Sequence, residues 1–326
     1  MKNIIFYCLL FVTTIGNAQK TYTQTLKLMG SRFDITVVAE NETQGNEYIQ
    51  LAIEEIQRIE KLISSWDPKS NTSKINANAG IKPVKTSPEL VGLIERCTKI
   101  SQITDGAFDI TYASMDKIWK FDGSVTEMPS PEKVKASVSK VGYQNIVIDK
   151  LNQTVFLKKV GMKIGFGAVG KGYAADVAKK LLMRKGVKAG IINASGDMNT
   201  WGIQPNGDFW EVAITNPKDK TKAFGMLPIH NNAVVTSGNY EKFILINGKR
   251  YTHIIDPRTG YPAHGLSSVT IFAPKAELAD ALATSVFVMG KEIGLNRINQ
   301  IPNVECIIVD DEGNLYKSNN ILFNKL

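Results

Sequence analysis

Cysteine and histidine are scarce in this sequence of 326 residues, which contains three of each. One cysteine lies in the N-terminal leader described below, whereas Cys97 and Cys306 lie far apart, without a Cys-x-x-Cys or Cys/His spacing. This pattern argues against a zinc site and against a disulfide scaffold. We expect two buried, inert thiols, with a single bridge between them as the alternative. Because the histidines are only His230, His253 and His264, proton transfer by an imidazole has few candidates.

Long runs of one charge are also missing. The chain has 39 basic and 31 acidic residues and a net charge of +8, but no block of five or more like charges. We therefore expect a solvated, lysine-rich surface and no nucleic-acid partner. A hydrophobic fraction of 43% and a charged fraction of 21% exclude a disordered or collagen-like chain, and the length permits a sizeable core.

The longest apolar run, Ile4–Val12, is far shorter than the ~20 apolar residues that span a bilayer. It follows a short positive start and precedes the small-residue site Gly16-Asn17-Ala18, a pattern typical of a secretory signal. Cys8 lies inside this run and lacks the small-residue context of bacterial lipidation. We expect a signal peptide over residues 1–18, cleaved after Ala18, and an exported, periplasmic domain over residues 19–326. Membrane association would then not depend on a lipid, and a retained leader is the alternative.

The pattern of apolar residues predicts mixed secondary structure. Strand-like alternation occurs in two segments, 24–39 and 234–255, and the second contains the hairpin signal Asn247-Gly248. Helical spacing occurs over residues 47–64, 88–102 and 173–184, and a connector is expected around 122–131. Strands and helices do not alternate regularly, so we expect an α+β fold of mostly antiparallel sheets flanked by helices rather than a doubly wound parallel sheet.

The glycine-rich segment KIGFGAVGKGYAAD (163–176) suggests a phosphate site. Its glycines formally match a dinucleotide fingerprint and a P-loop, but Gly172 stands where a P-loop needs Ser or Thr, and no acidic residue closes a following strand. Three features of the segment nevertheless favour a bound phosphate: its small residues, the helix that begins near Tyr173 and the cation of Lys171. The alternative is a plain strand–turn–helix corner.

Two further segments carry candidate chemistry. In ELADALATSVFVMG (277–290), Asp280 and Thr284 lie four residues apart on one face of a predicted helix, and their oxygens suit magnesium. The alternative is an acidic first turn with a threonine bonded to its own helix. In THIIDPRTGYP (252–262), a strand ends in a turn that presents His253, Asp256 and Arg258, although a lone histidine is often only a structural polar residue.

In order along the chain, the motifs LMGSRFDI, SSWDPKSNTSKIN, TDGAFDIT, GAVGKGYAAD, INASGDM, THIIDPRTGYP and ADALATS resemble those of the FAD:protein FMN transferases, the ApbE family. The resemblance runs from about Met29 to Gly290. It implies the fold of that family and a magnesium enzyme that takes FAD as its substrate. Such an enzyme passes the FMN phosphoryl group to a Thr or Ser hydroxyl of an acceptor protein and releases AMP, although some members hydrolyse FAD to FMN and AMP.

The resemblance also implies roles for individual residues. Those that correspond to FAD contacts are Met29, Trp66, Ala107, Phe108, Asp109, Gly165, Lys171, Asp197 and Ile254. The magnesium ligands would be the Ala168 carbonyl and the Asp280 and Thr284 side chains, an all-oxygen set. Asn193 and Gly196 correspond to a loop at the pocket. Gly165 stands where the family usually has an aspartate, so one hydrogen bond to FAD would be missing or supplied by another residue.

For catalysis we expect His253 to accept the proton of the acceptor hydroxyl, with Asp256 either orienting it or capping the turn. The resemblance also implies exported acceptor flavoproteins of respiratory electron transport as partners. Two alternatives remain open at this point. The protein could be a magnesium-dependent FAD pyrophosphatase, or a periplasmic FAD-binding protein without turnover.

Overall fold

The N-terminal segment with strand-like alternation folds into a hairpin of two strands, β1 (Lys20–Leu28) and β2 (Ser31–Ala39). Its turn is Met29-Gly30, and both residues have positive φ, 49° and 74°. Glycine adopts this conformation readily. Met29 adopts it as well, and its N–H donates to a Glu60 carboxylate oxygen (3.3 Å). The structure, a computed structural model, describes residues 19–321 except 123, 125, 126, 217, 218, 240–242 and 248.

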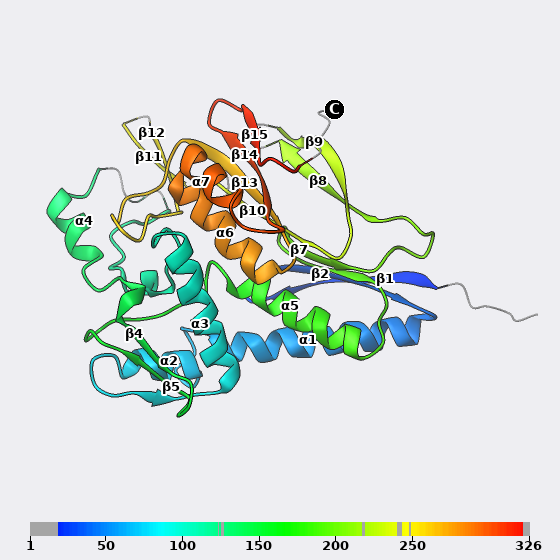
Figure 1. Ribbon diagram of the computed structural model, residues 1–326, viewed down its shortest axis with the longest axis horizontal. Coiled ribbons are helices and arrows are strands. Elements are labelled where there is room, and N and C mark those ends of the chain that lie inside the picture. The colour runs from blue at the N-terminus through cyan, green and yellow to red at the C-terminus, as the bar shows by residue number, and fades with distance from the viewer. Residues whose placement is uncertain are drawn as a thin grey trace, which may run out of the picture.

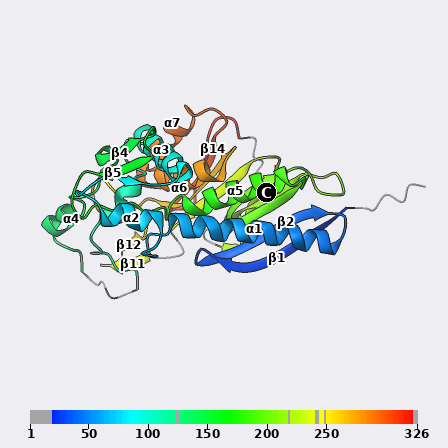
Figure 2. The same cartoon turned by 90° about the horizontal axis from the view of Figure 1, so that it is seen from below.

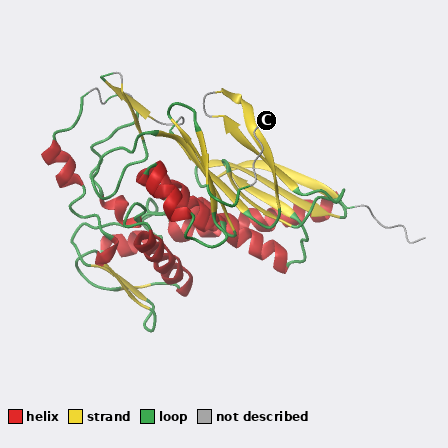
Figure 3. Ribbon diagram, turned by 45° about the horizontal axis from the view of Figure 1, so that its top comes forward, coloured by secondary structure: helices red, strands yellow, loops and turns green. Residues whose placement is uncertain are grey.

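This hairpin begins a sheet of eight strands in which all neighbouring pairs are antiparallel (Figure 3). In spatial order the strands are β1, β2, β6 (Gly190–Ala194), β7 (Asp197–Trp201), β10 (Ala233–Gly238), β13 (Leu266–Ala273), β14 (Glu305–Asp310) and β15 (Leu315–Lys317). The predicted α+β fold with mostly antiparallel sheet is therefore confirmed.

Three long helices lie side by side on one face of this sheet, α1 (Glu42–Ile63), α5 (Gly170–Arg184) and α6 (Ala276–Met289) (Figures 1 and 2). Their apolar residues recur at intervals of three and four and are buried, as at Ile49, Ile53 and Ile56 of α1. The predicted helices 47–64, 173–184 and 277–290 are thus present. The first begins earlier than predicted because Asn41 caps a polar first turn, and its side chain accepts from the Gln44 N–H (3.0 Å).

The opposite face of the sheet is covered by a long hairpin, β8 (Trp210–Asn216) and β9 (Asp219–Ile229). Val212, Ile214 and Ile229 from this hairpin pack against apolar residues of the sheet in a separate cluster. Strand β13 is consequently buried at every position, since helices cover one side of the sheet and the hairpin covers the other.

A smaller group of elements lies at one end of α1 (Figure 1). It contains α2 (Asn71–Ala77), α3 (Pro88–Ile103) and a three-stranded antiparallel sheet of β3 (Val84–Lys85), β5 (Thr154–Leu157) and β4 (Ile146–Asp149). The remaining short elements are the 3-10 helices η1 (Ile110–Ser114) and η2 (Tyr143–Asn145), α4 (Pro131–Ser137) and α7 (Lys291–Ile298). The predicted helix 88–102 corresponds to α3, which Ser87 caps through the Leu90 N–H (3.2 Å).

The second segment with strand-like alternation, 234–255, forms three strands. After β10, the hairpin of β11 (Phe243–Ile246) and β12 (Lys249–Thr252) forms a separate two-stranded sheet. The predicted turn lies between these strands. Asn247 has a positive φ of 51°, whereas Gly248 lies outside the described residues.

Cys97 and Cys306 are both free and buried, as expected. Burial raises the pKa of the Cys306 thiol to about 12, which keeps it protonated and unreactive. Within residues 19–321, so far as they are described, no helix is both long and apolar enough to cross a membrane. The predicted leader over residues 1–18 lies outside the described residues.

Candidate active site

One cavity of about 610 Å³ opens where α5 and α6 meet the segments that follow α1, α3 and β12. It brings together residues that are distant in sequence. Of those identified from the sequence, it is lined by Trp66, Ala107, Phe108, Asp109, Gly165, Ala168, Lys171, Asp197, His253, Ile254, Asp280 and Thr284. The volume is in the range of small-molecule sites. The segments that carry the motifs therefore converge on a single site.

The cationic part of this cavity lies at the start of α5. Lys171 occupies the first turn, and no side chain caps the helix at Val169. The Lys171 ammonium forms an ion pair with Asp197 at the start of β7, whose side chain is only 4% exposed. A cation beside a helix N-terminus favours an anionic group such as a phosphate, as the glycine-rich motif predicts.

The oxygen-rich part of the cavity consists of Ala168, Asp280 and Thr284. Asp280 is buried, and its Oδ2 accepts from the Gly172 N–H (3.2 Å). Burial raises the pKa of this carboxyl, while the nearby charge of Lys171 and the Gly172 N–H act in the opposite direction. A cation bound there would offset the cost of burying the carboxylate. A carboxylate, a hydroxyl and a carbonyl are the oxygen ligands that a hard cation takes, so the residues present fit one.

No cluster of three or more His, Cys, Asp or Glu side chains with metal-binding geometry occurs among the residues that the structure describes. The candidate cation site contributes one carboxylate and no nitrogen or sulfur ligand, so it does not have the composition of a zinc site.

The apolar part of the cavity includes Trp66 and Phe108. Trp66 is 81% exposed at the mouth, and the Lys117 ammonium lies 4.8 Å from the centre of its ring. Phe108 is buried, and the following Asp109 fixes the turn through hydrogen bonds from the Thr111 N–H (2.7 Å) and the Tyr143 N–H (2.8 Å). Burial raises the pKa of Asp109, although these donors favour its charged form. Asp109 thus holds the turn that positions Phe108.

His253 and Ile254 follow β12 and line the cavity, but Asp256 does not. The Asp256 carboxylate accepts from Nε and a terminal nitrogen of Arg258, each at 2.9 Å, and also from the Arg258 N–H. These contacts favour turn capping, one of the two roles considered for Asp256. The His253 ring instead lies edge-on to Phe121, with 6.4 Å between ring centres.

Met29 also lies outside the lining of the cavity. Its side chain packs at the start of α5, with Cε 3.7 Å from where a Cβ on Gly170 would stand. Asn193 and Gly196 are not lining residues either. The Asn193 Oδ1 accepts from the Gly196 N–H (2.8 Å), and this turn presents Ser195 to the cavity.

Sequence reasoning missed several polar residues that line the cavity, namely Ser31, Ser65, Tyr112, Ser195, Thr236 and Ser237. The run Thr236-Ser237-Gly238 ends β10 and offered the clearest signal, because short polar residues beside a glycine at a strand end often approach ligands. The others are single residues in turns, and no local pattern distinguishes them.

This cavity of a mixed α+β domain joins a cation at a helix end, a buried carboxylate, a hydroxyl and a histidine. Such a site has the features of an enzyme that acts on a phosphate ester or anhydride. The sequence profile described as the ApbE family matches residues 29–308, and the chain belongs to this family.

Curated relatives named FAD:protein FMN transferase are similar along most of their length. The chain is 30% identical to the protein of Klebsiella pneumoniae over 292 residues, which are 89% of each chain. It is 31% identical to the protein of Treponema pallidum over 281 residues, 80% of this chain and 77% of that one.

Solved structures support the fold. An ApbE protein of Thermotoga maritima matches with a TM-score of 0.83 and 30% identity, covering 92% of this chain and 97% of that one. The flavinyl transferase ApbE of Pseudomonas stutzeri, in its apo form, matches with a TM-score of 0.81 and 25% identity, covering 92% and 95%. The eight-stranded sheet with its helices is therefore the fold of this family.

Proposed function

We propose that this protein transfers the FMN moiety of FAD to a Thr or Ser hydroxyl of an acceptor protein and releases AMP. The observation that carries this proposal is the convergence of Lys171, Asp280, Thr284 and His253 on one cavity. Membership of the ApbE family and the names of its curated relatives support the same activity.

The helix-end residues would bind the diphosphate of FAD. Lys171 lies in the first turn of α5, where its ammonium can pair with phosphate oxygens beside the positive end of the helix. Phosphoryl transfer depends mainly on positioning and on neutralising charge, so this contact would hold the reacting phosphorus in place. Asp197 forms an ion pair with Lys171 and would keep the Lys171 side chain directed into the cavity.

Magnesium would be held by the Asp280 carboxylate, the Thr284 hydroxyl and the Ala168 carbonyl. When bound, it would supply charge neutralisation to the diphosphate and to the departing AMP. The protein's own part is to present these three oxygens from a helix and a glycine-rich loop that pack against each other.

His253 would accept the proton of the acceptor hydroxyl. The hydroxyl oxygen forms a bond to the phosphorus of the FMN half, and the bond from this phosphorus to the oxygen of the AMP half breaks. The proton passes to the imidazole, and AMP leaves with the bridging oxygen. Trp66 and Phe108 would contact the ring systems of FAD, since an aromatic face at the mouth of a cavity can stack on a planar ring.

The expected setting is the periplasm, with exported flavoproteins of respiratory electron transport as acceptors. The predicted signal peptide supports export. N-terminal sequencing of the protein recovered from a bacterial host would find Gln19 as the first residue, and a cytosolic product that begins at Met1 would contradict this.

Incubation with FAD, magnesium and an acceptor domain, followed by intact mass measurement, tests the activity. We expect the acceptor to gain the mass of FMN in phosphoester linkage, with one AMP released for each FMN transferred. Rapid AMP release that does not depend on the acceptor would instead identify an FAD pyrophosphatase. Intact FAD after long incubation, retained on the protein, would identify a binding protein without turnover.

A further inference from the structure

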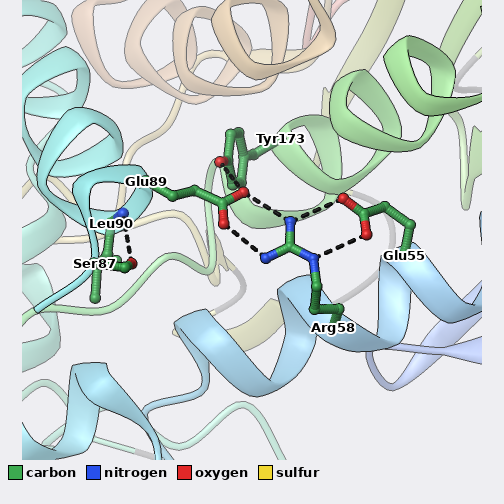
Figure 4. A network of polar contacts seen from close by, with 6 residues as sticks. All are labelled: Glu55, Arg58, Ser87, Glu89, Leu90 and Tyr173. Atoms are coloured by element: carbon green, nitrogen blue, oxygen red, sulfur yellow. Dashed lines mark hydrogen bonds and ion pairs between the residues drawn. The ribbon is translucent and has the colours of Figure 1, made fainter. Parts of the chain in front are cut away.

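A second cavity, of about 830 Å³, lies between α1, α3, α5 and α6. Ion pairs between arginine and glutamate side chains connect its helices, and Figure 4 shows those of Arg58. Arg58 binds both Glu55 (2.8 Å) and Glu89 (2.7 Å), and the Tyr173 hydroxyl donates to Glu89 (2.9 Å). These contacts connect α1, α3 and α5, so this cavity is a braced junction between helices.

Asp176 lies at this junction, on α5. Its Oδ1 accepts from the Ala276 N–H and its Oδ2 from the Glu277 N–H, both at 2.9 Å. These are the first two residues of α6, which has no side-chain cap of its own at Lys275. Burial raises the pKa of Asp176 to about 6, so the carboxylate is ionised at neutral pH and can accept both bonds. Asp176 therefore caps a helix from which it is about one hundred residues distant in sequence.

The contact is reciprocal. Asp280 of α6 accepts from the Gly172 N–H at the start of α5 (3.2 Å), and α5 also lacks a side-chain cap. The two helices approach closely at this point, because a Cβ on Gly172 would stand only 2.3 Å from the Ala276 carbonyl oxygen. Each helix thus supplies the aspartate that binds the N-terminus of the other.

Strand β7 completes the junction. The Asn199 Nδ2 donates to the Asp176 Oδ1 (2.5 Å). Asp197, two positions earlier on the same face of this strand, pairs with Lys171. The carboxylate of Asp176, on α5, therefore accepts hydrogen bonds from α6, which carries Asp280 and Thr284, and from β7, which carries Asp197.

We propose that Asp176 is a positioning residue for the cation site: its cap on α6 sets where Asp280 and Thr284 stand relative to Lys171. The inference rests on the proposed function only for the identity of the cation. Asp176 itself does not line the active cavity. It acts through the N-terminus of α6, one turn before Asp280.

The test uses the full mature chain with Asp176→Asn, an isosteric change that removes the charge and turns one acceptor into a donor. Mn²⁺, a paramagnetic substitute for magnesium, is titrated in the absence of acceptor, and free Mn²⁺ is measured by electron paramagnetic resonance. Because partners that orient metal ligands typically contribute 10- to 100-fold, we expect Mn²⁺ affinity to fall by about 10- to 100-fold. FAD binding measured in a chelator, where Lys171 acts without the metal, should stay near that of the wild type.

The matched control is Tyr173→Phe, which removes another hydrogen bond of α5, the one to Glu89, but leaves the α6 cap in place. It should lower the melting temperature and leave Mn²⁺ affinity unchanged. If Asp176→Asn and Tyr173→Phe have the same Mn²⁺ affinity, Asp176 is only a stabilising residue and the inference is wrong.

If Asp176→Asn does not fold, Asp176→Glu keeps the charge but displaces the carboxylate by one methylene. We expect its Mn²⁺ affinity to be lower than that of the wild type, and a wild-type value would overturn the proposal. The readout is metal binding, so it is separate from the proposed activity. A protein that binds Mn²⁺ in an Asp176-dependent way but transfers no FMN would retain this inference and refute the function.

Discussion

The helix wall of the active cavity, which carries Lys171, Asp280 and Thr284, differs in construction from the loop wall, which carries Trp66 and His253. The helix wall belongs to α5 and α6, whose inner residues are fully buried against the main sheet. The loop wall consists of turns and the end of a two-stranded hairpin that is not part of that sheet. The groups proposed to bind the phosphate and the cation thus stand on helices packed against the main sheet. The proposed aromatic contact and the proposed proton acceptor stand on less constrained elements.

The largest effect is expected on the helix wall. Asp280→Ala removes the only carboxylate among the proposed cation ligands, and we expect FMN transfer to fall by ~10³-fold or more. Raised magnesium should restore activity at best partly, because two oxygen ligands remain. Rates measured across a magnesium series test this. A variant with wild-type turnover at ordinary magnesium would remove Asp280 from the site.

On the loop wall, His253→Ala should slow transfer by ~10²–10⁴-fold, the usual contribution of a general base. FAD and Mn²⁺ binding should remain near normal, and the pH profile should lose the limb that the imidazole causes. The alternative is that His253 only supports the turn before Pro257. In that case binding, turnover and melting temperature would fall together and the shape of the pH profile would persist.

Lys171→Ala should weaken FAD by about tenfold to a hundredfold, because one charge-assisted phosphate contact is worth about 1.5–3 kcal/mol. The melting temperature should also fall, since the buried Asp197 loses its ion pair, and Lys171→Ala combined with Asp197→Asn should recover part of that loss. Lys180→Ala, on an exposed part of the same helix, is the matched control. Equal FAD dissociation constants for Lys171→Ala and Lys180→Ala would locate the diphosphate elsewhere.

Trp66→Ala is expected to have a smaller effect. Loss of one stacking contact at the mouth should weaken FAD by about twofold to tenfold. The side chain is 81% exposed, so the melting temperature should not change. Flavin fluorescence titration of Trp66→Ala and Trp66→Phe measures the FAD affinity, and thermal unfolding measures the melting temperature. The conservative variant should retain most of the affinity, and an equal loss in both would argue against stacking.

The smallest effect concerns the brace behind the helix wall. Arg58 is 46% exposed, so Arg58→Ala should lower the free energy of unfolding by only about 0.5–1 kcal/mol. The Arg58 guanidinium lowers the pKa of Glu89, so this stabilisation is present above the ordinary value of 4.5 and is lost as the pH falls through the lowered one. Denaturant unfolding should show a larger difference between variant and wild type at neutral pH than in acid, and a constant difference would contradict the assignment.

The residues of the two walls also differ in how well sequence motifs predict the direction of their side chains. Lys171 and Asp280 lie in motifs with local spacing, and both were identified as site residues without coordinates. Asp256 lies in an equally clear motif, yet its carboxylate binds Arg258 within the same turn. Met29 lies in the first motif of the family and stands outside the cavity, where it packs at the start of α5. A motif identifies a segment near the site, but side-chain direction depends on contacts that the motif does not contain.

By itself, the sequence determined the types of the main elements, the antiparallel class of the fold, the family and most of the residues around the cavity. The element types and the fold class depend on alternation, helical spacing and capping residues, which are local properties of the chain. The family and most of the site residues follow from the resemblance of the motifs. Tertiary structure alone decided which helix starts meet and which partners buried charges find. Asp176 caps α6 and Asp280 binds α5 because the long-range packing of the helices on the sheet brings each carboxylate to backbone N–H groups about one hundred residues away. No local pattern encodes such a pairing, since its energy arises only when both helices are already in place.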